Sequence, residues 1–402
     1  MLIKSFTLLV AGICLIGCKS ERPTAPPSDV QAVGSRGPLN PALIASGKTI
    51  FRFDTYGDET FWTDTLRMHE VIRTSVSPTT ALSVGLKVDV DALPPAVLTA
   101  LQNKTIDLND PATTVTLLKL GAVLGVIGHV DANNTLTGVG ITCAFCHSTV
   151  DNSFATGIGH RLDGWPNRDL NVGGIIALSP ALTAAQRTVY QSWGPGKYDP
   201  RFNIDGKNIP VVIPPAFGLR DVKREIYTGD DTISYWNAYV AITQMHGHGH
   251  FVDSRIGVDI NNPPDLVSDK LEALRAYQFS IAAPEAPADD KAAAQRGRAV
   301  FNGVAKCASC HLGDALTDVN ANRLHEPAEV GQNAAYAQRS ATKLYRTTPL
   351  RGLWHPPQLQ GPYFHDGSAP TLGAAVAHYE KLLGLTLTAQ QRSDLVAYLK
   401  TL

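Results

Sequence analysis

The chain has 402 residues, which is enough for two or three domains with sizeable hydrophobic cores. Hydrophobic residues make up 44% of it and charged residues 18%, a balance that excludes an intrinsically disordered chain. The formal net charge of −1 argues against a nucleic-acid-binding surface and against a strongly charged membrane-binding surface.

The first 18 residues have the pattern of a bacterial export signal. Lys4 supplies the positive start, and residues 6–16 form an apolar stretch that is too short to span a bilayer. The stretch ends in Leu15-Ile16-Gly17-Cys18, which resembles the lipobox of bacterial lipoproteins, where the signal is cut before the cysteine and the cysteine is acylated. The alternative is an ordinary signal peptide with an unrelated cysteine. The resemblance implies a protein of the bacterial periplasm that is attached to the inner or outer membrane by a lipid anchor only.

Two blocks of the chain echo each other after residues 19–41, whose Ser, Pro, Thr and Gly content predicts a flexible tether. Each block opens with a predicted helix, contains a Cys-x-x-Cys-His sequence and closes on a predicted amphipathic helix. The paired segments are 47–51 with 297–301, 143–147 with 307–311, 215–219 with 349–353, 226–229 with 364–367, and 274–277 with 395–398. The repeat predicts an N-terminal domain at 42–283, a stiff linker at 284–290 and a C-terminal domain at 291–402.

The first block carries a long insertion between its opening helix and its Cys-x-x-Cys-His sequence. The separation is 96 residues in the range 47–143, against 10 residues in the range 297–307. Within the insertion, the segments 126–130 and 135–141 flank a turn and predict a small β-hairpin. We therefore expect a mainly α-helical fold of two domains, the first of which contains the hairpin.

Three helix starts are predicted from local signals. Asp110-Pro111 has the pattern of a helix start, with proline at the first helical position. Ser268 and Ser393 are the predicted N-caps of the two closing helices.

Four of the six cysteines lie in the two Cys-x-x-Cys-His sequences. Cys14 would leave with the signal and Cys18 is the candidate for the lipid, so no cysteine is left for a disulfide. In this pattern the two thiols form thioethers with haem, and the adjacent histidine reaches the iron from the same face of a helical turn. A redox pair does not need the histidine, and a zinc site would need thiolates kept reduced outside the cytoplasm. We expect two covalently bound haem c groups, held by Cys143, Cys146, His147, Cys307, Cys310 and His311.

The segment 347–372 carries the most specific resemblance to a known family. Its parts Thr347-Thr348-Pro349-Leu350-Arg351 and Pro362-Tyr363-Phe364-His365-Asp366-Gly367 resemble the patterns of the bacterial di-haem cytochrome c peroxidase superfamily. That superfamily also includes the methylamine-utilisation di-haem enzyme and, more distantly, rubber oxygenases. The resemblance covers the C-terminal domain well, and the N-terminal domain only through the haem sequence, residues 215–219 and the order of elements. It implies two cytochrome c-type domains.

The function implied by the resemblance is that of a peroxidase-like oxidoreductase. Electrons would pass from a small donor protein of cytochrome or cupredoxin type to the second haem, and peroxide or another small oxidant would meet the first haem. Two alternatives stay open. One is a non-enzymatic electron-transfer cytochrome with two six-coordinate haems, and the other is an oxygenase of the rubber-cleaving type.

Three catalytic candidates follow from the same resemblance. Tyr227 stands where the family has a tryptophan between the haems, so it implies either an aromatic relay or a residue that fills the domain interface. The family's distal glutamate is missing, and Gln244 stands near its place but cannot transfer a proton. His246, the first of a Gly-His cluster with His248 and His250, is the candidate substitute, and the glycines of the cluster predict a mobile loop.

The distal iron ligands are the last set of candidates. In the C-terminal domain Tyr379 falls at the family's ligand position and is favoured over His378, which is turned by about 100° around the helix. The alternative is a core-packed Tyr379 with the iron open or bound by His325 or His355. For the first iron, the candidates are Met245 and a histidine of the Gly-His cluster, with packing and a solvated loop as the alternatives. Candidate partners of the haem propionates are Arg161, Arg168 and Arg351.

Overall fold

The computed structural model describes residues 37–286, 290–354 and 361–402. The predicted signal, Cys18 and most of the tether lie outside the described residues, as do residues 287–289 of the linker. Helices dominate the described chain, and its strands form five two-stranded sheets. None of the described helices is both long and apolar enough to cross a membrane.

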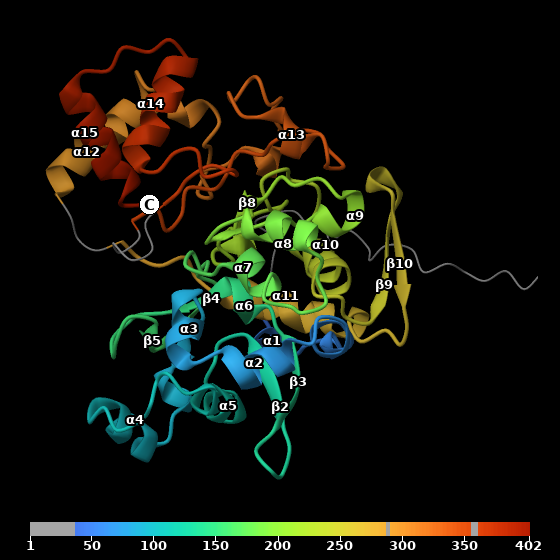
Figure 1. Ribbon diagram of the computed structural model, residues 1–402. Helices are drawn as coiled ribbons and strands as arrows, with labels where there is room; N and C mark the ends of the chain where they lie inside the picture. Colours follow the sequence, from blue (N-terminus) through green and yellow to red (C-terminus); the bar gives the residue numbers. More distant parts are fainter. Residues whose placement is uncertain (1–36, 287–289, 355–360) are drawn as a thin grey trace, which may run out of the picture.

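Most elements of the first two thirds of the chain are short, and they are drawn in blue to yellow in Figure 1. The helices up to the first Cys-x-x-Cys-His sequence are α1 (Pro41–Phe53), α2 (Met68–Ser75), α3 (Pro78–Ser83), α4 (Pro95–Gln102), α5 (Pro111–Lys119) and α6 (Ala144–His147). The later helices are α7 (Val172–Ile176), α8 (Ala184–Gln191), α9 (Phe202–Asp205), α10 (Ile233–Tyr239), α11 (Leu271–Ser280), α12 (Lys291–Asn302), α13 (Ala334–Ala337), α14 (Leu372–Leu382) and α15 (Ala389–Leu399). The strands are β1 (Val88–Asp89), β2 (Val126–Val130), β3 (Leu136–Ile141), β4 (Ser148–Val150), β5 (Ile158–Gly159), β6 (Arg161–Asp163), β7 (Lys197–Tyr198), β8 (Val211–Val212), β9 (Gly249–Asp253) and β10 (Val258–Asn262).

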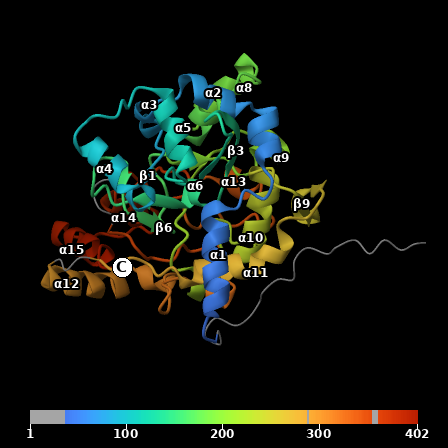
Figure 2. The same cartoon turned by 90° about the horizontal axis from the view of Figure 1, so that it is seen from below.

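Two helix pairs are built in the same way. Helix α1 packs on α11, and α12 packs on α15, and both pairs are visible in Figure 1 and Figure 2. A β-carbon at Gly47 would lie 1.9 Å from the carbonyl oxygen of Ala273, and a β-carbon at Gly297 would lie 1.9 Å from that of Asp394. Only glycine allows such close helix contact, so the glycine of each opening helix sets the distance to its closing helix.

Aromatic contacts complete the likeness of the two pairs. Phe51 meets Tyr277 edge to face with ring centroids 5.4 Å apart, and Phe301 meets Tyr398 in the same way at 5.3 Å.

The loops between the helices also share backbone geometry, because three paired positions have positive φ. These are Gly218 with Gly352, Ile226 with Phe364, and Gly229 with Gly367. The sequence repeat therefore corresponds to a repeat of packing and of backbone conformation.

The strands β2 and β3 pair antiparallel, and their buried side chains belong to the largest hydrophobic cluster of the described chain. Thr63 donates its hydroxyl to the carbonyl of Val139 at 2.8 Å and accepts the Val139 amide at 2.7 Å. The amide of Ile141 donates to the carboxyl of Asp58, whose pKa burial raises to about 9. Helix α5 begins at Pro111, as predicted, and Asp110 is its N-cap.

The caps predicted at Ser268 and Ser393 are wrong. Ser268 begins a 3-10 turn, and α11 starts only at Leu271. Ser393 lies inside α15, whose N-cap is Thr388 in a reciprocal pair of hydrogen bonds with Gln391. The Thr-x-x-Gln capping box satisfies two backbone donors at once and therefore outcompetes a serine further along.

The prediction of a mobile loop over the Gly-His cluster is also wrong for its second half. Residues 249–253 form β9, which pairs antiparallel with β10 and projects from the right side of Figure 1. His250 pairs with Asn261 in this ladder, and the next residue, Phe251, is fully buried. Alternation of buried and half-buried residues along β9, with Phe251 as the anchor, outweighs the helix- and strand-weakening effect of the glycines.

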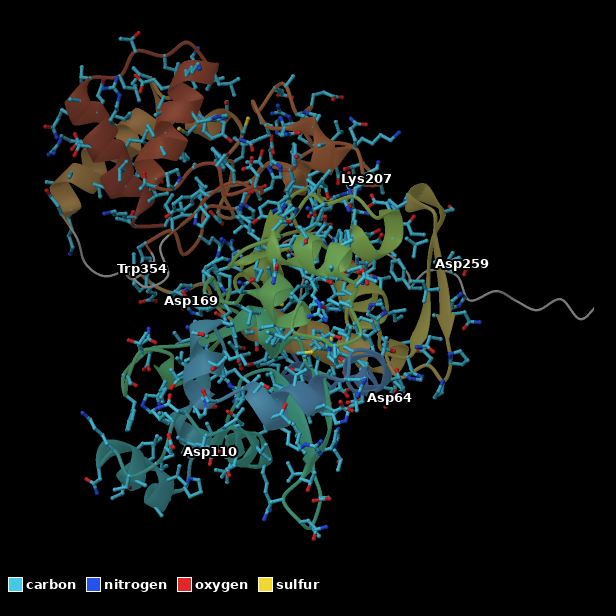
Figure 3. The ribbon with its side chains drawn as sticks, viewed as in Figure 1. Asp64, Asp110, Asp169, Lys207, Asp259 and Trp354 are labelled. Atoms are coloured by element: carbon cyan, nitrogen blue, oxygen red, sulfur yellow. The ribbon has the colours of Figure 1, made fainter. Side chains whose placement is uncertain are left out.

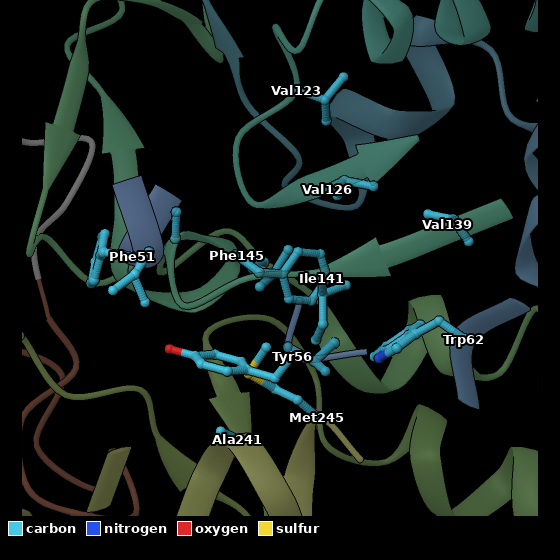
Figure 4. Packing of buried hydrophobic residues seen from close by; sticks show 14 of the residues in the cluster. Phe51, Tyr56, Trp62, Val123, Val126, Val139, Ile141, Phe145, Ala241 and Met245 are labelled. Carbon is cyan, nitrogen blue, oxygen red and sulfur yellow. The ribbon is translucent and has the colours of Figure 1, made fainter. Parts of the chain in front are cut away.

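Hydrophobic packing falls into one large cluster and two small ones. The large cluster joins α1, α2, α5, α10 and α11 and includes Phe145 and Met245, as Figure 4 shows. A small cluster joins α12, α14 and α15. A third, with Tyr336 and Tyr345, packs against Tyr227 and so connects the C-terminal region to the rest of the chain.

Candidate functional site

The first Cys-x-x-Cys-His sequence folds as a short helix, α6, which begins directly after Cys143. His147 donates Nδ1–H to the carbonyl oxygen of Pro214 at 3.1 Å. Because a carbonyl oxygen only accepts, this bond fixes the proton on Nδ1 and leaves the lone pair of Nε2 free. Burial lowers the pKa of His147 to about 4, so the ring is neutral at physiological pH. A neutral ring oriented through its other nitrogen is the arrangement that metal-binding histidines have.

The second Cys-x-x-Cys-His sequence repeats this arrangement on a 3-10 turn, Cys307–Ser309. His311 donates Nδ1–H to the carbonyl oxygen of Leu316 at 2.9 Å, and burial lowers the pKa of His311 as well. Its Nε2 is therefore also available to an iron.

Each sequence faces its own cavity. Cys143, Cys146 and His147 line the first cavity, and Cys307 and His311 line the second. The empty volumes, which include space open to solvent, are about 1520 and 1540 Å³. Each Cys-x-x-Cys-His sequence thus has its own cavity with thiol and imidazole groups on its wall, as a site for one haem requires.

Cys310 lines neither cavity. Each of the other three cysteines lines the cavity of its own sequence. Its sulfur lies 3.8 Å from the hydroxyl of Ser309, in a group with Asp318 and His325 whose ligand atoms lie within 4.8 Å of one another. His325 Nε2 is already in contact with Asp318 at 3.1 Å and with Thr347 at 3.0 Å. The group is thus a hydrogen-bond network, and a thioether at Cys310 requires rotation of that side chain toward the cavity.

The thiols and histidines of the two sequences form the donor set of covalently attached haem. Burial raises the pKa of Cys143 and of Cys146 to about 12, and that of Cys307 to about 11. Two thiols followed directly by a histidine, beside a cavity, match the attachment of haem through two thioethers and one imidazole ligand.

The two cavities share one wall. The residues that line both are Pro214, Pro215, Leu219, Glu225, Ile226, Tyr227 and Arg346. The hydroxyl of Tyr227 donates to the carbonyl oxygen of Val212 at 2.9 Å, and burial raises the pKa of Tyr227. The structure thus places Tyr227 between the two candidate haem positions.

Glu225 is a site residue that the sequence did not reveal. Among the described residues that line the first cavity it is the one carboxylate, and it pairs with Arg346 at 3.0 Å in the shared wall. The family's distal glutamate is expected after the segment 226–229, whereas Glu225 directly precedes that segment. The nearby signal was an acid adjoining the aromatic-glycine segment.

Gln244 and Met245 both line the first cavity. The side-chain oxygen of Gln244 accepts the hydroxyl of Tyr198 at 2.7 Å, and its amide nitrogen donates to the hydroxyl of Thr243 at 2.7 Å. Met245 is 4% exposed and packs in the large cluster, where Figure 4 shows it beside Tyr56. Gln244 is thus locked by two hydrogen bonds, and Met245 has a packing role whether or not it reaches an iron.

His246 lines the first cavity, whereas the other two histidines of the cluster do not. Its ring stacks on Phe61 at a centroid distance of 3.7 Å, and Nε2 accepts the amide of Asn203 at 3.1 Å. Burial lowers the pKa of His246 to about 4, so the ring is neutral. His248 instead donates to the carbonyl of Pro263. In this arrangement neither nitrogen of His246 has a free lone pair for an iron.

Tyr379 lines the second cavity, and His378 does not. Burial, with a smaller contribution from the neighbouring thiols, raises the pKa of Tyr379 to about 12. His378 donates Nε2–H to the carbonyl oxygen of Val330 at 3.0 Å, on another side of the helix. His325 is absent from the cavity lining as well, and His355 lies outside the described residues.

The arginine candidates differ in their surroundings. Arg161 lines neither cavity and pairs with Asp89 at 3.2 Å. Arg168 and Arg351 both line the second cavity. Arg351 donates to the carbonyl of Gly218 at 2.7 Å and reaches the carboxylate of Asp221 at 3.5 Å.

Comparison with known proteins agrees with this chemistry. The cytochrome c family model matches residues 294–402. The methylamine utilization protein MauG of Methylorubrum extorquens is 34% identical over 155 residues, which are 32% of this chain and 42% of that protein. Cytochrome-c peroxidase IdrP1 of Denitromonas iodatirespirans is 29% identical over 181 residues, which cover 32% of this chain and 48% of that protein. The chain thus matches under half the length of these relatives.

A solved structure of hydrazine synthase from Kuenenia stuttgartiensis aligns with 48% of this chain and 72% of that one at 19% identity, but its TM-score of 0.35 carries no argument. The cytochrome c match and the two relatives imply c-type haem as the cofactor. These sequence matches support a relationship of the chain to the di-haem cytochrome c peroxidase superfamily.

Proposed function

We propose that the chain carries two covalently bound haem c groups in two cytochrome c-type domains, at 42–283 and 291–402, and acts as a peroxidase-like oxidoreductase. The pair of cavities carries this proposal. They are nearly equal in volume, each is lined by cysteine and by a neutral histidine with a free Nε2, and they share one wall. The like packing of α1 on α11 and of α12 on α15 supports the two domains.

In this proposal a small donor protein of cytochrome or cupredoxin type delivers electrons at the second haem, and peroxide or another small oxidant meets the first. Val304 and Leu312 flank the second Cys-x-x-Cys-His sequence and are 55% and 42% exposed. They give a protein partner an apolar surface beside that site. Tyr227 in the shared wall supplies an aromatic ring between the sites. Bound haem supplies the one-electron chemistry, and the protein supplies its position and surroundings.

A second candidate function, a non-enzymatic electron-transfer cytochrome, is favoured by the polar groups of the first cavity. Gln244 is locked in two hydrogen bonds, His246 is neutral, and Glu225 is paired with Arg346. General acid–base catalysis works best with a group whose pKa lies near the operating pH. None of these side chains is arranged to deliver a proton to an oxidant.

An electron paramagnetic resonance spectrum of the resting protein distinguishes the two functions. A peroxidase-like protein should show a high-spin iron with an open position, and that iron should bind cyanide. An electron-transfer cytochrome should show two low-spin irons, bind no cyanide and fail to react with peroxide. A haemochrome assay of the denatured protein should count two covalent haems, and a count of one or none would refute the shared part of both proposals.

We also propose export to the bacterial periplasm with a lipid anchor at Cys18. The lipobox-like sequence before that cysteine supports it. Labelled fatty acid should enter the wild-type protein but not a Cys18→Ala variant. Equal labelling of both proteins would contradict the anchor and leave export untouched.

A further inference from the structure

Three arginine side chains line the second cavity, and their partners differ. Arg346 pairs with Glu225 at 3.0 Å, and Arg351 reaches Asp221 at 3.5 Å. Arg168 has no carboxylate partner within ion-pair distance among the described residues. Its one hydrogen bond there runs from Nη1 to the carbonyl oxygen of Pro362, at 3.3 Å.

The surroundings of Arg168 make this lack of a counter-charge costly. Burial lowers the pKa of Arg168, which shows that the side chain has lost water without gaining a negative neighbour. The polar groups nearest to it include the hydroxyls of Tyr227 and Tyr363, which are neutral. A partly buried cation in this position is stabilised only if an anion occupies the cavity it lines.

We propose that Arg168 binds a propionate carboxylate of the haem attached at Cys307 and Cys310. The assignment rests on the proposed second haem, whose propionates are the carboxylates that this cavity would receive. Guanidinium and carboxylate form short, often bidentate, charge-assisted hydrogen bonds. Arg351, another propionate candidate from the sequence, is already engaged with Gly218 and Asp221 and is therefore the weaker partner.

The position of Arg168 in the chain gives this contact a second consequence. Its neighbour Asn167 donates its backbone amide to the carbonyl oxygen of Cys146 at 2.9 Å, so the segment that holds the first haem sequence also reaches the second cavity. Figure 3 labels Asp169, which follows Arg168, and Trp354, and both lie where the N-terminal and C-terminal regions meet. Arg168 would thus connect the two haem sites directly.

The experiment is a redox titration of the whole protein, followed by optical spectroscopy, for wild type, Arg168→Gln and Arg168→Lys. Removal of the guanidinium leaves the propionate charge uncompensated, which stabilises the oxidised iron. The midpoint potential of one haem should therefore shift downward in Arg168→Gln. Arg168→Lys should recover part of the shift, because it keeps the charge but not the fork of donors. Resonance Raman bands of propionate bending should change in Arg168→Gln.

Two controls make the result specific. Arg298→Gln removes the same charge from an exposed position on α12 outside the cavity and should leave the midpoint close to wild type. Arg351→Gln should shift it less than Arg168→Gln. The shift should persist in a Cys143→Ala/Cys146→Ala background, which retains only the second sequence.

The outcomes separate this inference from the proposed function. Two covalent haems with potentials and propionate bands unchanged in Arg168→Gln would overturn the inference and leave the function standing. A larger shift in Arg351→Gln than in Arg168→Gln would move the propionate contact to Arg351 and also overturn it. A haem count of one in wild type would overturn the proposed function itself.

Discussion

The two candidate haem ligands are held by carbonyl groups at very different distances along the chain. His147 bonds to Pro214, 67 residues away, and Pro214 belongs to the wall that both cavities share. His311 bonds to Leu316, only 5 residues away. The same chemical task is thus performed by tertiary packing in the first site and by a local turn in the second.

The surrounding cores follow the same division. The first sequence lies in the large cluster, where Ala144 and Phe145 are buried among residues from many elements. The second lies beside a small cluster of α12, α14 and α15. A ligand fixed by distant contacts responds to changes throughout its region, whereas a ligand fixed by its own turn is insulated from them. The first site is therefore the one that the protein can tune, and the second is the more autonomous.

Loss of each cysteine pair should have the largest effect. The variants Cys143→Ala/Cys146→Ala and Cys307→Ala/Cys310→Ala should each reduce the count of covalent haems from two to one. The first variant should also lower the thermal midpoint more, because its cavity opens within the large core. Haemochrome assays and thermal unfolding of both variants test this. Equal loss of stability in the two would break the proposed difference between the sites.

The buried acids of the two regions should respond to pH in opposite ways. In the first region burial raises the pKa of Asp58 to about 9, with Glu59 as a smaller cause. In the second region the hydrogen bond from Arg296 lowers the pKa of Asp394. The folded state therefore keeps Asp58 protonated, whereas the unfolded chain ionises it above about pH 4. Stability contributed by Asp58 is full below that pH and is lost as the pH rises toward 9.

The Asp58→Asn variant tests this sign. At pH 7 it should gain on the order of 4 kcal/mol, from about three pH units at about 1.4 kcal/mol each. At pH 4 the gain should vanish. Urea unfolding of wild type and variant from pH 4 to 9 gives the comparison, and parallel curves across that range would show that Asp58 is ionised in the folded protein.

The paired helices predict a smaller effect that is equal in the two regions. Gly47→Ala and Gly297→Ala each place a β-carbon 1.9 Å from a backbone oxygen of the partner helix, so the helices must separate. Each variant should lose about 1–3 kcal/mol of unfolding free energy. Gly373→Ala is the matched control, because its β-carbon would meet nothing closer than Thr371 at 3.7 Å. That control should gain about 0.4–1 kcal/mol. If the two variants lose different amounts of unfolding free energy, the two helix pairs share their geometry but not their contribution to stability.

Local sequence signals predicted a large part of this arrangement. The opening and closing helices and the start of α5 at Pro111 depend on residues within a few positions of one another. The capping box at Thr388 and Gln391 is likewise a local signal, since the Thr-x-x-Gln spacing alone indicates it. Such features need no knowledge of the fold.

Features made by distant residues could not be predicted in the same way. The Pro214 carbonyl, the Glu225–Arg346 pair and the strand at 249–253 depend on which segments the fold brings together. The place of Tyr227 between the two cavities was predicted only from the family resemblance, which aligns it with the tryptophan between the haems. A resemblance to a known family thus supplies tertiary information that composition and periodicity lack.

The smallest expected effect concerns the ligands that distinguish the two irons. Residues 291–402 contain no methionine, so the proposed second haem would have no thioether ligand from its own domain. Met245 lines the first cavity, but it also packs in the large cluster at 4% exposure. We expect a packing role, in which Met245→Leu conserves volume and costs less than about 1.5 kcal/mol.

The optical spectrum decides between packing and ligation by Met245. A sulfur-to-iron charge-transfer band should be absent from both wild type and Met245→Leu, and both potentials should be low, because thioether ligation raises a haem's potential. A band that is present in wild type and lost in Met245→Leu would make Met245 a ligand of the first iron. The first site would then be closed as well as tunable, which favours electron transfer without an enzymatic reaction. A band that survives in Met245→Leu would require another thioether, and Met68, buried at the start of α2, is the one remaining methionine in the described chain.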